Sequence, residues 1–259
     1  GFMSFFKQMI TAIYKFQSYP QLIIQKMSKV VCYLILFTII IAIINSIPFA
    51  VSYKKMGGVA GAIEKYVPDF SINNGTFTCK HIDYTNDVLG VKIYIDDNED
   101  VNNIDVSNTE LYVLADKDKM IIGNTLQKSV MNFSQFGNDY INKDKLIEFF
   151  GSTKVKAAIF SIVVVSSLLS MVVGTFFSVV MLSIFAMCIN VCFVKANIGF
   201  GDTFKLSVYA RTFPSIFILV MGFGGFAGGT ILYWGLLITY LYLGLKNIKK
   251  QEAIILAEL

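Results

Sequence analysis

Charged residues are scarce in this sequence. Asp, Glu, Lys and Arg make up only 15% of its 259 residues, whereas soluble globular domains carry about a quarter. Histidine occurs once, as His81, without an HExxH motif or a triad partner nearby. Four cysteines are present, and only Cys79 lies in the polar part of the chain, so that part cannot be a disulfide-stapled module. The scarcity of charge excludes an ordinary soluble fold.

Apolar residues dominate instead, and they gather in four blocks. The blocks cover about residues 30–51, 155–194, 206–221 and 231–245. A helix needs roughly 20 predominantly apolar residues to cross a hydrocarbon core about 30 Å thick. The sequence therefore predicts a multi-pass protein of the cell membrane, mainly α-helical, with about four transmembrane helices. A small extracytoplasmic β-rich domain is expected between the first and second crossings.

This pattern predicts the following organisation along the chain. The expected parts are an interfacial amphipathic helix and linker at 3–29, a first transmembrane helix at 30–52, the extracytoplasmic β-rich domain at 67–138, and a helical bundle at 139–259 with crossings at about 155–194, 206–222 and 230–245 and a cytoplasmic C-terminal tail.

The N-terminal segment, residues 4–19, has the pattern of an amphipathic helix. Phe residues recur on one side at spacings of three and four, and Lys7 and Lys15 face the other way. Such a helix tends to lie in the membrane interface. Packing against the other membrane helices is the alternative, and the two are compatible. Pro20 is expected to end the helix.

The distribution of lysine predicts the orientation. Four lysines and no acidic residue precede the first crossing, whereas residues 53–153 hold about five more acidic than basic residues. Positive charge accumulates on the cytoplasmic side, so the N-terminus should be cytoplasmic and the β-rich domain outside. The net charge of +4 gives no indication of nucleic acid as a partner.

The long block at 155–194 is either one helix or a hairpin that turns near Gly174. One crossing keeps Lys195, Lys205 and the C-terminal lysines in the cytoplasm, whereas two crossings place them outside. We therefore expect four crossings and a cytoplasmic C-terminus, with five crossings as the alternative.

The polar segment alternates apolar and polar residues, as short strands do. Residues 76–83 should form one strand with Phe77, Cys79 and His81 on one face. Further strands are expected at 91–95, 111–114 and 120–122, with turns at 73–75 and 116–119 and a helix at 142–150. The acidic loop at 96–108 lacks the glycine and terminal Glu of an EF-hand, so a solvated loop is favoured over a cation site.

Two motifs invite a catalytic interpretation. Gly199-Phe200-Gly201-Asp202 matches the GxGD of intramembrane aspartyl proteases, but that chemistry needs two carboxylates and the apolar blocks offer no second one. Asp202 is better explained as a helix-capping carboxylate. Cys188 and Cys192 share a helix face without further ligands, so a metal site is not indicated. We predict no catalytic residues, no cofactor and no metal.

The candidate functional residues form a polar spot in the third crossing. Arg211 lies a turn or two inside an apolar block, next to Tyr209 and Pro214, and Asn190 is a polar residue near the end of the preceding block. An intramembrane charge either marks a functional site or extends to the interface.

Two short stretches carry a family resemblance. These are the opening Ser-Phe-Phe-Lys-Gln run that ends at Tyr14 and the Gly-Asp-Thr-Phe-Lys run at 201–205, followed by Tyr209-Ala210 and Pro214. They resemble a bacterial membrane family of unknown function, with members labelled as maltodextrin-utilisation proteins, grouped with the Yip-type membrane proteins. The resemblance implies a multi-helix scaffold, although Yip-type proteins have five helices, and it implies a sugar-uptake transporter as one candidate partner.

These observations favour a non-enzymatic scaffold or accessory protein of the cell envelope. Its partners would be the lipid bilayer and another membrane or envelope protein bound by the outer domain. The alternative is a transporter or lipid-handling protein, which should carry several polar residues deep in its crossings, where only Asn190 and Arg211 come close. An intramembrane aspartyl protease is third.

Overall fold

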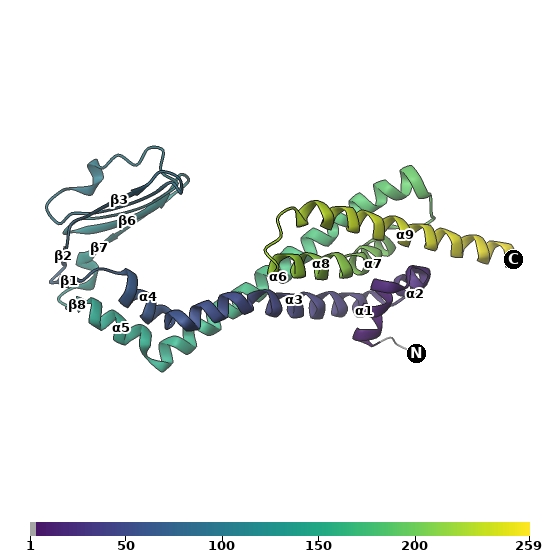
Figure 1. Cartoon of the computed structure of the whole chain (residues 1–259), viewed down its shortest axis with the longest axis horizontal. Helices are drawn as coiled ribbons and strands as arrows, with labels where there is room; N and C mark the ends of the chain where they lie inside the picture. The colour runs from purple at the N-terminus through teal and green to yellow at the C-terminus, as the bar shows by residue number, and fades with distance from the viewer. Residues whose placement is uncertain (1–3) are drawn as a thin grey trace. The chain divides into compact units, whose positions relative to one another are not determined.

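The computed structural model describes residues 4–259, so Met3, where the expected N-terminal segment begins, lies outside the described residues. The chain is mainly helical and divides into two compact units. The helical unit contains the described residues up to Pro48 together with Ile162–Leu259, and the β unit contains Phe49–Ser161. Figure 1 traces both along the chain.

Within residues 4–259, four helical segments are long and apolar enough to cross a membrane. They are α3 (Met27–Met56), α6 (Thr153–Ile189) with its π-helical extension η4 (Asn190–Val194), the pair α7 (Phe200–Ala210) and α8 (Thr212–Phe223), and α9 (Gly229–Glu258). By length and composition, these helices are consistent with a multi-pass membrane protein. α6 is continuous through Gly174, so the expected single helix is found and the hairpin alternative is not.

The N-terminal segment differs from the single amphipathic helix expected at 4–19. It consists of α1 (Phe5–Tyr14), the 3₁₀ turn η1 (Phe16–Ser18) and α2 (Tyr19–Ile23). Pro20 does not end a helix. It occupies the first turn of α2, where its missing N–H and fixed φ suit a helix start.

The side of α1 that packs is also different from the one that the Phe pattern favoured. Gln8, Thr11 and Ala12 are its buried residues, whereas Phe6 is 65% exposed. Phe5 and Met9 are partly buried against the helical core. The helix therefore turns a partly polar side toward the other helices, because Gln8 accepts a hydrogen bond from the Tyr209 hydroxyl.

The β unit contains two helices and eight strands in two sheets. The helices are α4 (Gly58–Tyr66) and α5 (Lys143–Gly151), which lie side by side in Figure 1. The three-stranded sheet has the order β2-β1-β8, from β1 (Phe70–Asn73), β2 (Thr76–Cys79) and β8 (Ile141–Asn142). The five-stranded sheet has the order β3-β4-β5-β6-β7, from β3 (Ile82–Asn86), β4 (Val91–Ile95), β5 (Leu111–Ala115), β6 (Lys119–Asn124) and β7 (Lys128–Asn132).

The expected single strand at 76–83 is two strands in different sheets. β2 ends at Cys79 and β3 begins at Ile82, and β3 pairs with β4 rather than with β1. Phe77 and Cys79 are buried as the alternation predicted. His81 lies in the link between the strands with its side chain 57% exposed, because the chain leaves one sheet for the other there.

Other local predictions for this segment are confirmed. Asn74 (φ 50°) and Gly75 (φ 76°) form the β1–β2 turn, where left-handed backbone suits these residue types. Asp116 lies at the turn between β5 and β6, and α5 begins after its N-cap residue Asn142. The inner faces of the two sheets share a core that includes Ile72, Phe77 and Phe133.

The connection from the first long helix into the β unit was not predicted. α3 continues to Met56, beyond the expected end near residue 52, with Pro48 inside it. Gly57 and Gly58 then turn the chain with positive φ, and α4 follows.

Candidate functional site

A buried polar cluster lies within the helical unit, and Tyr209 is at its centre. We call it the Tyr209 cluster. Its members come from α1, the α2–α3 link, α3, α7 and α8, and they are Gln8, Gln25, Tyr33, Tyr209 and Thr212. Thus helices far apart in the sequence meet at polar side chains inside an otherwise apolar core.

Hydrogen bonds join the members of the cluster. The Tyr209 hydroxyl donates to Gln8 Oε1 at 2.6 Å and accepts from Gln25 Nε2 at 3.0 Å. The Tyr33 and Thr212 hydroxyls lie 2.7 Å apart. Gln8, Tyr33, Tyr209 and Thr212 are each at most 3% exposed. These hydrogen bonds favour this arrangement of the helices, because separating the partners would leave buried polar groups unpaired. Gln25 Oε1 is buried without a hydrogen-bond partner among the described residues.

Further bonds hold the N-terminal helices on the bundle. Lys205 Nζ donates to the backbone oxygens of Ile23 (3.1 Å) and Gln25 (2.7 Å), where the free carbonyls at the end of α2 need a cation or donor. The Tyr240 hydroxyl of α9 donates to the Ile13 oxygen at 2.8 Å. The Tyr19 hydroxyl donates to the Ala12 oxygen at 2.6 Å. The arrangement has no nucleophile beside a base, so it can position helices but shows no chemistry of its own.

Of the four predicted site residues, only Tyr209 belongs to this cluster. Arg211 is half-buried at the α7–α8 junction, and its guanidinium makes no hydrogen bond or ion pair with any residue from 4 to 259. Pro214 is buried in the first turn of α8. Asn190 acts elsewhere: its side chain accepts from the Ala196 N–H (2.8 Å) and donates to the Ala196 oxygen (2.9 Å), which closes the turn after η4.

The loop after η4 is also held by the far end of α9. Lys249 Nζ donates to the Val194 oxygen at 2.8 Å. The Glu252 carboxylate accepts from the Asn197 N–H at 3.1 and 3.2 Å. These two side chains join the last helix to the connection between α6 and α7.

Asp202 lies in the first turn of α7, but it is not the helix cap. The N-cap residue is Gly199, whose oxygen accepts from the Thr203 hydroxyl. A carboxylate in the first turn suits the positive end of the helix dipole. Within the described part of the chain, no group of three or more His, Cys, Asp or Glu residues could hold a metal ion.

Carboxylates of the β unit are used in internal bonds around Lys119. Its Nζ lies 3.2 Å from Asp100 and 3.3 Å from Asp116. Burial alone would raise the pKa of Asp116, but hydrogen bonds from the N–H groups of Asp118, Lys119 and Val101 outweigh it and lower the pKa. Asp116 thus fastens the acidic loop to the β5–β6 turn, which is a structural role.

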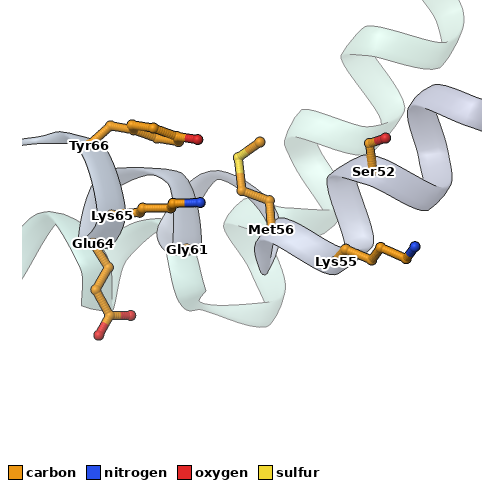
Figure 2. Close-up of a pocket in the computed structure, with 7 residues that line it drawn as sticks. All are labelled: Ser52, Lys55, Met56, Gly61, Glu64, Lys65 and Tyr66. Atoms are coloured by element: carbon orange, nitrogen blue, oxygen red, sulfur yellow. The ribbon is translucent and has the colours of Figure 1, made fainter.

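A shallow hollow lies where α3 passes into α4. Its volume is about 480 Å³, and its lining includes Ser52, Lys55, Gly61, Lys65 and Tyr66. Figure 2 shows the Lys65 and Tyr66 side chains lying alongside each other and pointing toward Met56, while the Glu64 carboxylate points the other way. Lys65 Nζ is 5.3 Å from the centre of the Tyr66 ring. The hollow is basic and open to solvent.

A second cavity lies between the sheets of the β unit, and it is entirely apolar. Its volume is about 300 Å³. The two sheets, the η3 turn (Phe133–Phe136), α5 and the segment after α4 contribute to its lining, which includes Val67, Ile72, Cys79, Met131 and Leu146. Burial raises the pKa of the Cys79 thiol, so it is a poor nucleophile at neutral pH.

This cavity is half-open to solvent, and Met131 in its lining is 36% exposed. Its apolar lining therefore faces water in part, which is unfavourable for hydrocarbon surface. An apolar occupant would remove that surface from water.

Neither cavity was predicted from the sequence. The strand alternation located Phe77 and Cys79 on an inner face, but it does not say that side chains from two sheets fail to fill the space between them. Gln8 and Gln25 were also missed as site residues, because glutamines on the polar side of an amphipathic helix or in a short polar link are usually solvated. The spacing of Gln8 and Thr11, which puts both on one side of α1, was an available signal.

Fold and sites together define a helical protein with four helices able to cross a membrane and a small two-sheet unit inserted between the first and second of them. The chain belongs to the family described as "Protein of unknown function (DUF1189)", which matches residues 6–245 and thus both units. Comparison with curated proteins and with solved structures finds no match.

Proposed function

We propose that this chain is a non-enzymatic accessory protein of the cell envelope, anchored in the membrane by its helices, whose β unit binds an extended segment of another envelope protein. The β unit would lie outside the cytoplasmic membrane, with both chain termini in the cytoplasm. The observation that carries the proposal is the free edge of β7.

β7 is the last strand of the five-stranded sheet and has a strand neighbour only in β6. All five of its residues are exposed, including Val130 at 47%. Exposed strand edges present unpaired backbone groups that can accept an added strand. The edge is neither shortened by a bulge nor interrupted by proline.

The register identifies which backbone groups are free. Asn124 N–H donates to the Gln127 oxygen, and Phe133 N–H donates to the Asp118 oxygen. Hydrogen-bonded pairs alternate with non-bonded pairs along an antiparallel ladder. Residues 129 and 131 therefore bond to β6, and the N–H and C=O groups of Lys128, Val130 and Asn132 point outward.

Charge favours a basic segment as the partner. Residues 67–138 contain eleven Asp and Glu against five Lys. Complementary charge increases the rate of association and excludes like-charged competitors. The likeness of the N-terminal run and of residues 201–205 to maltodextrin-utilisation and Yip-type membrane proteins makes a sugar-uptake transporter one partner to test.

A proline at one position separates strand addition from other modes of binding. Val130→Pro removes an outward N–H but no ladder bond to β6, which edge strands tolerate. We expect the variant to insert and remain monodisperse, and to lose at least tenfold of the partner co-purified from native membranes after mild crosslinking. Quantitative mass spectrometry of the captured proteins measures this loss.

Val130→Thr is the matched control. It retains the N–H and the β-branched shape while removing the apolar γ-methyl contact, so it should retain the partner. Equal capture by the wild-type protein and by Val130→Pro would refute binding at β7. Equal loss in both variants would instead indicate recognition of the Val130 side chain.

A further inference from the structure

We propose that the β unit is also a binding site for an anionic membrane lipid, with one hydrocarbon chain in the apolar cavity between the sheets and the phosphate of the headgroup in the basic hollow at the α3–α4 junction. The site requires neither the β7 edge nor a protein partner. It therefore goes beyond the proposed function, and the two can fail independently.

The apolar lining of the cavity favours a hydrocarbon chain of the lipid as its occupant. No polar surface faces the space, so nothing in it could satisfy a polar ligand atom or hold a water molecule by two or more hydrogen bonds. A methylene group occupies slightly less space than a water molecule, whose share of the liquid is about 30 Å³. The volume of about 300 Å³ thus accommodates an acyl segment of about ten carbons.

The hollow supplies the groups that a phosphate needs. Lys55 and Lys65 are cations in its lining, and Ser52 and Tyr66 add hydroxyl donors. In Figure 2 the Lys55 ammonium points away from Lys65, so its flexible side chain would have to turn to reach the same phosphate, and the Glu64 carboxylate, which also lines the hollow, points away from the Lys65 ammonium. Lys55 makes no hydrogen bond or ion pair with any residue from 4 to 259, so its ammonium is available to a ligand. Lysines near a membrane surface attract anionic lipids through the same charge.

The two spaces are adjacent through the chain. Tyr66 lines the hollow and Val67, the next residue, lines the cavity. Consecutive Cα atoms are 3.8 Å apart, which is short compared with a lipid. Leu146 of α5 completes the cavity wall beside the segment that follows α4.

The position of this site within the unit favours a ligand that comes from the bilayer. The β unit includes residues 49–56, the end of α3, and 153–161, the start of α6, and both helices are able to cross a membrane. Ser52 and Lys55 belong to that end of α3. A lipid would therefore meet its headgroup site where a membrane-spanning helix leaves the apolar layer.

Protection of Cys79 from alkylation tests the proposal on the full chain. Cys32, Cys188 and Cys192 are replaced by alanine, so that Cys79 is the only thiol. The delipidated protein is kept in a detergent with a rigid steroid skeleton, which lacks the flexible hydrocarbon chain that the cavity is proposed to bind. The probe is dodecyl phosphate, and the measurement is the rate of modification by N-ethylmaleimide. We expect at least a fivefold slowing.

Two simpler probes distinguish the contribution of the phosphate from that of the hydrocarbon chain. Inorganic phosphate should not protect Cys79 at all. Dodecanol should need about a tenfold higher concentration than dodecyl phosphate, because two lysines no longer contribute. Phosphatidylglycerol, offered in mixed micelles, should protect as dodecyl phosphate does. Protection by inorganic phosphate alone, or none by dodecyl phosphate, would overturn the proposal.

Variants assign each half of the site. Lys55→Gln with Lys65→Gln should reduce dodecyl phosphate to the potency of dodecanol, whereas Lys54→Gln, beside the hollow, should not. Met131→Trp should fill the cavity and abolish protection. If that variant unfolds, Cys79 will react faster without any probe, and the lysine variants then decide.

Unchanged potency in the double lysine variant would refute the headgroup site. The Val130→Pro variant should keep full protection, whatever it does to partner capture.

Discussion

At the scale of single residues, Tyr209 is a buried polar group that joins α7 to two N-terminal segments. Its hydroxyl is both a donor to Gln8 and an acceptor from Gln25, and its ring packs 4.8 Å from that of Tyr33. Removing one partner of a buried hydrogen bond costs more than the bond contributes, because the other group stays buried without a partner.

Tyr209→Phe should therefore destabilise the helical unit by about 2 kcal/mol. The change keeps the ring and its packing, so the loss reports the hydroxyl alone. Thermal unfolding in detergent, followed by loss of helical circular dichroism, measures it. Tyr14→Phe is the control, since Tyr14 is 75% exposed and should leave the midpoint unchanged. A midpoint for Tyr209→Phe equal to that of the wild type would show that the cluster adds nothing to stability.

The sequence identified Tyr209 but not its partners. A tyrosine and an arginine stand out within an apolar block, so Tyr209 could be singled out, whereas Arg211 and Pro214 from the same block are not members of the cluster. Gln8 is 201 residues away from Tyr209 and Gln25 is 184 away. No local pattern reports a contact over such distances, and the Phe pattern of α1 indicated the opposite face. Asn190 was grouped with Arg211 by polarity alone, whereas it closes its own turn.

At the scale of elements, the passage from α3 into α4 is set by three glycines. Gly57 and Gly58 have φ of 87° and 72°, which side chains rarely adopt. At Gly61 the constraint is space: a Cβ there would lie 1.9 Å from the backbone oxygen of Met56. Backbone cannot move aside as a flexible side chain can, so α4 would have to shift.

Gly61→Ala should destabilise the β unit by about 1–3 kcal/mol through this overlap. The rate at which Cys79 reacts with N-ethylmaleimide in the single-cysteine protein should rise, since α4 leads directly into the cavity wall. Gly174→Ala is the matched helical control. Nothing lies within 4 Å of its Cβ position in α6, and alanine favours a helix. A larger effect at Gly174 than at Gly61 would contradict this explanation.

Elements whose start or end is marked by particular residue types could be predicted. Elements whose boundaries depend on contacts with distant residues could not. Asn74 and Gly75 are residue types that favour a turn with positive φ, and Asn142 is a residue type that favours the start of a helix. Residues 76–83 alternate without interruption, but alternation says only which side chains share a face, not that the strand changes sheet after Cys79. α4 was missed because three glycines within 57–61 resemble a loop. Its geometry depends on the Met56 carbonyl, which no pattern reveals.

At the scale of the whole molecule, we expect all four helices that are able to cross a membrane in residues 4–259 to do so, which would place both termini on one side. The charge distribution predicts that this side is the cytoplasm. In a cysteine-free background, Ser107→Cys should react with an impermeant maleimide added to intact cells. Ala257→Cys should react only after the membrane is permeabilised. Both positions are exposed.

External labelling at both residue 107 and residue 257 would place the C-terminus on the same side as the β unit and would contradict the four-helix topology. External labelling at residue 257 but not at residue 107 would keep four crossings and reverse the orientation. A cysteine at Leu126, which is 92% exposed in the same unit as Ser107, is the control for accessibility and should behave as Ser107→Cys does.

The hydrogen bonds between N-terminal and C-terminal helices also limit how early during synthesis the protein can complete its packing. The Tyr209 hydroxyl, which donates to Gln8 Oε1, lies 201 residues after Gln8 in the sequence, and the Tyr240 hydroxyl, which donates to the Ile13 oxygen, lies 227 residues after Ile13. At about 5–20 residues per second, translation of that interval takes roughly 10–45 s. Throughout this time α1 has emerged from the ribosome while α7 and α9 do not yet exist. The N-terminal helices therefore cannot complete their final packing until α7 and α9 have been synthesised.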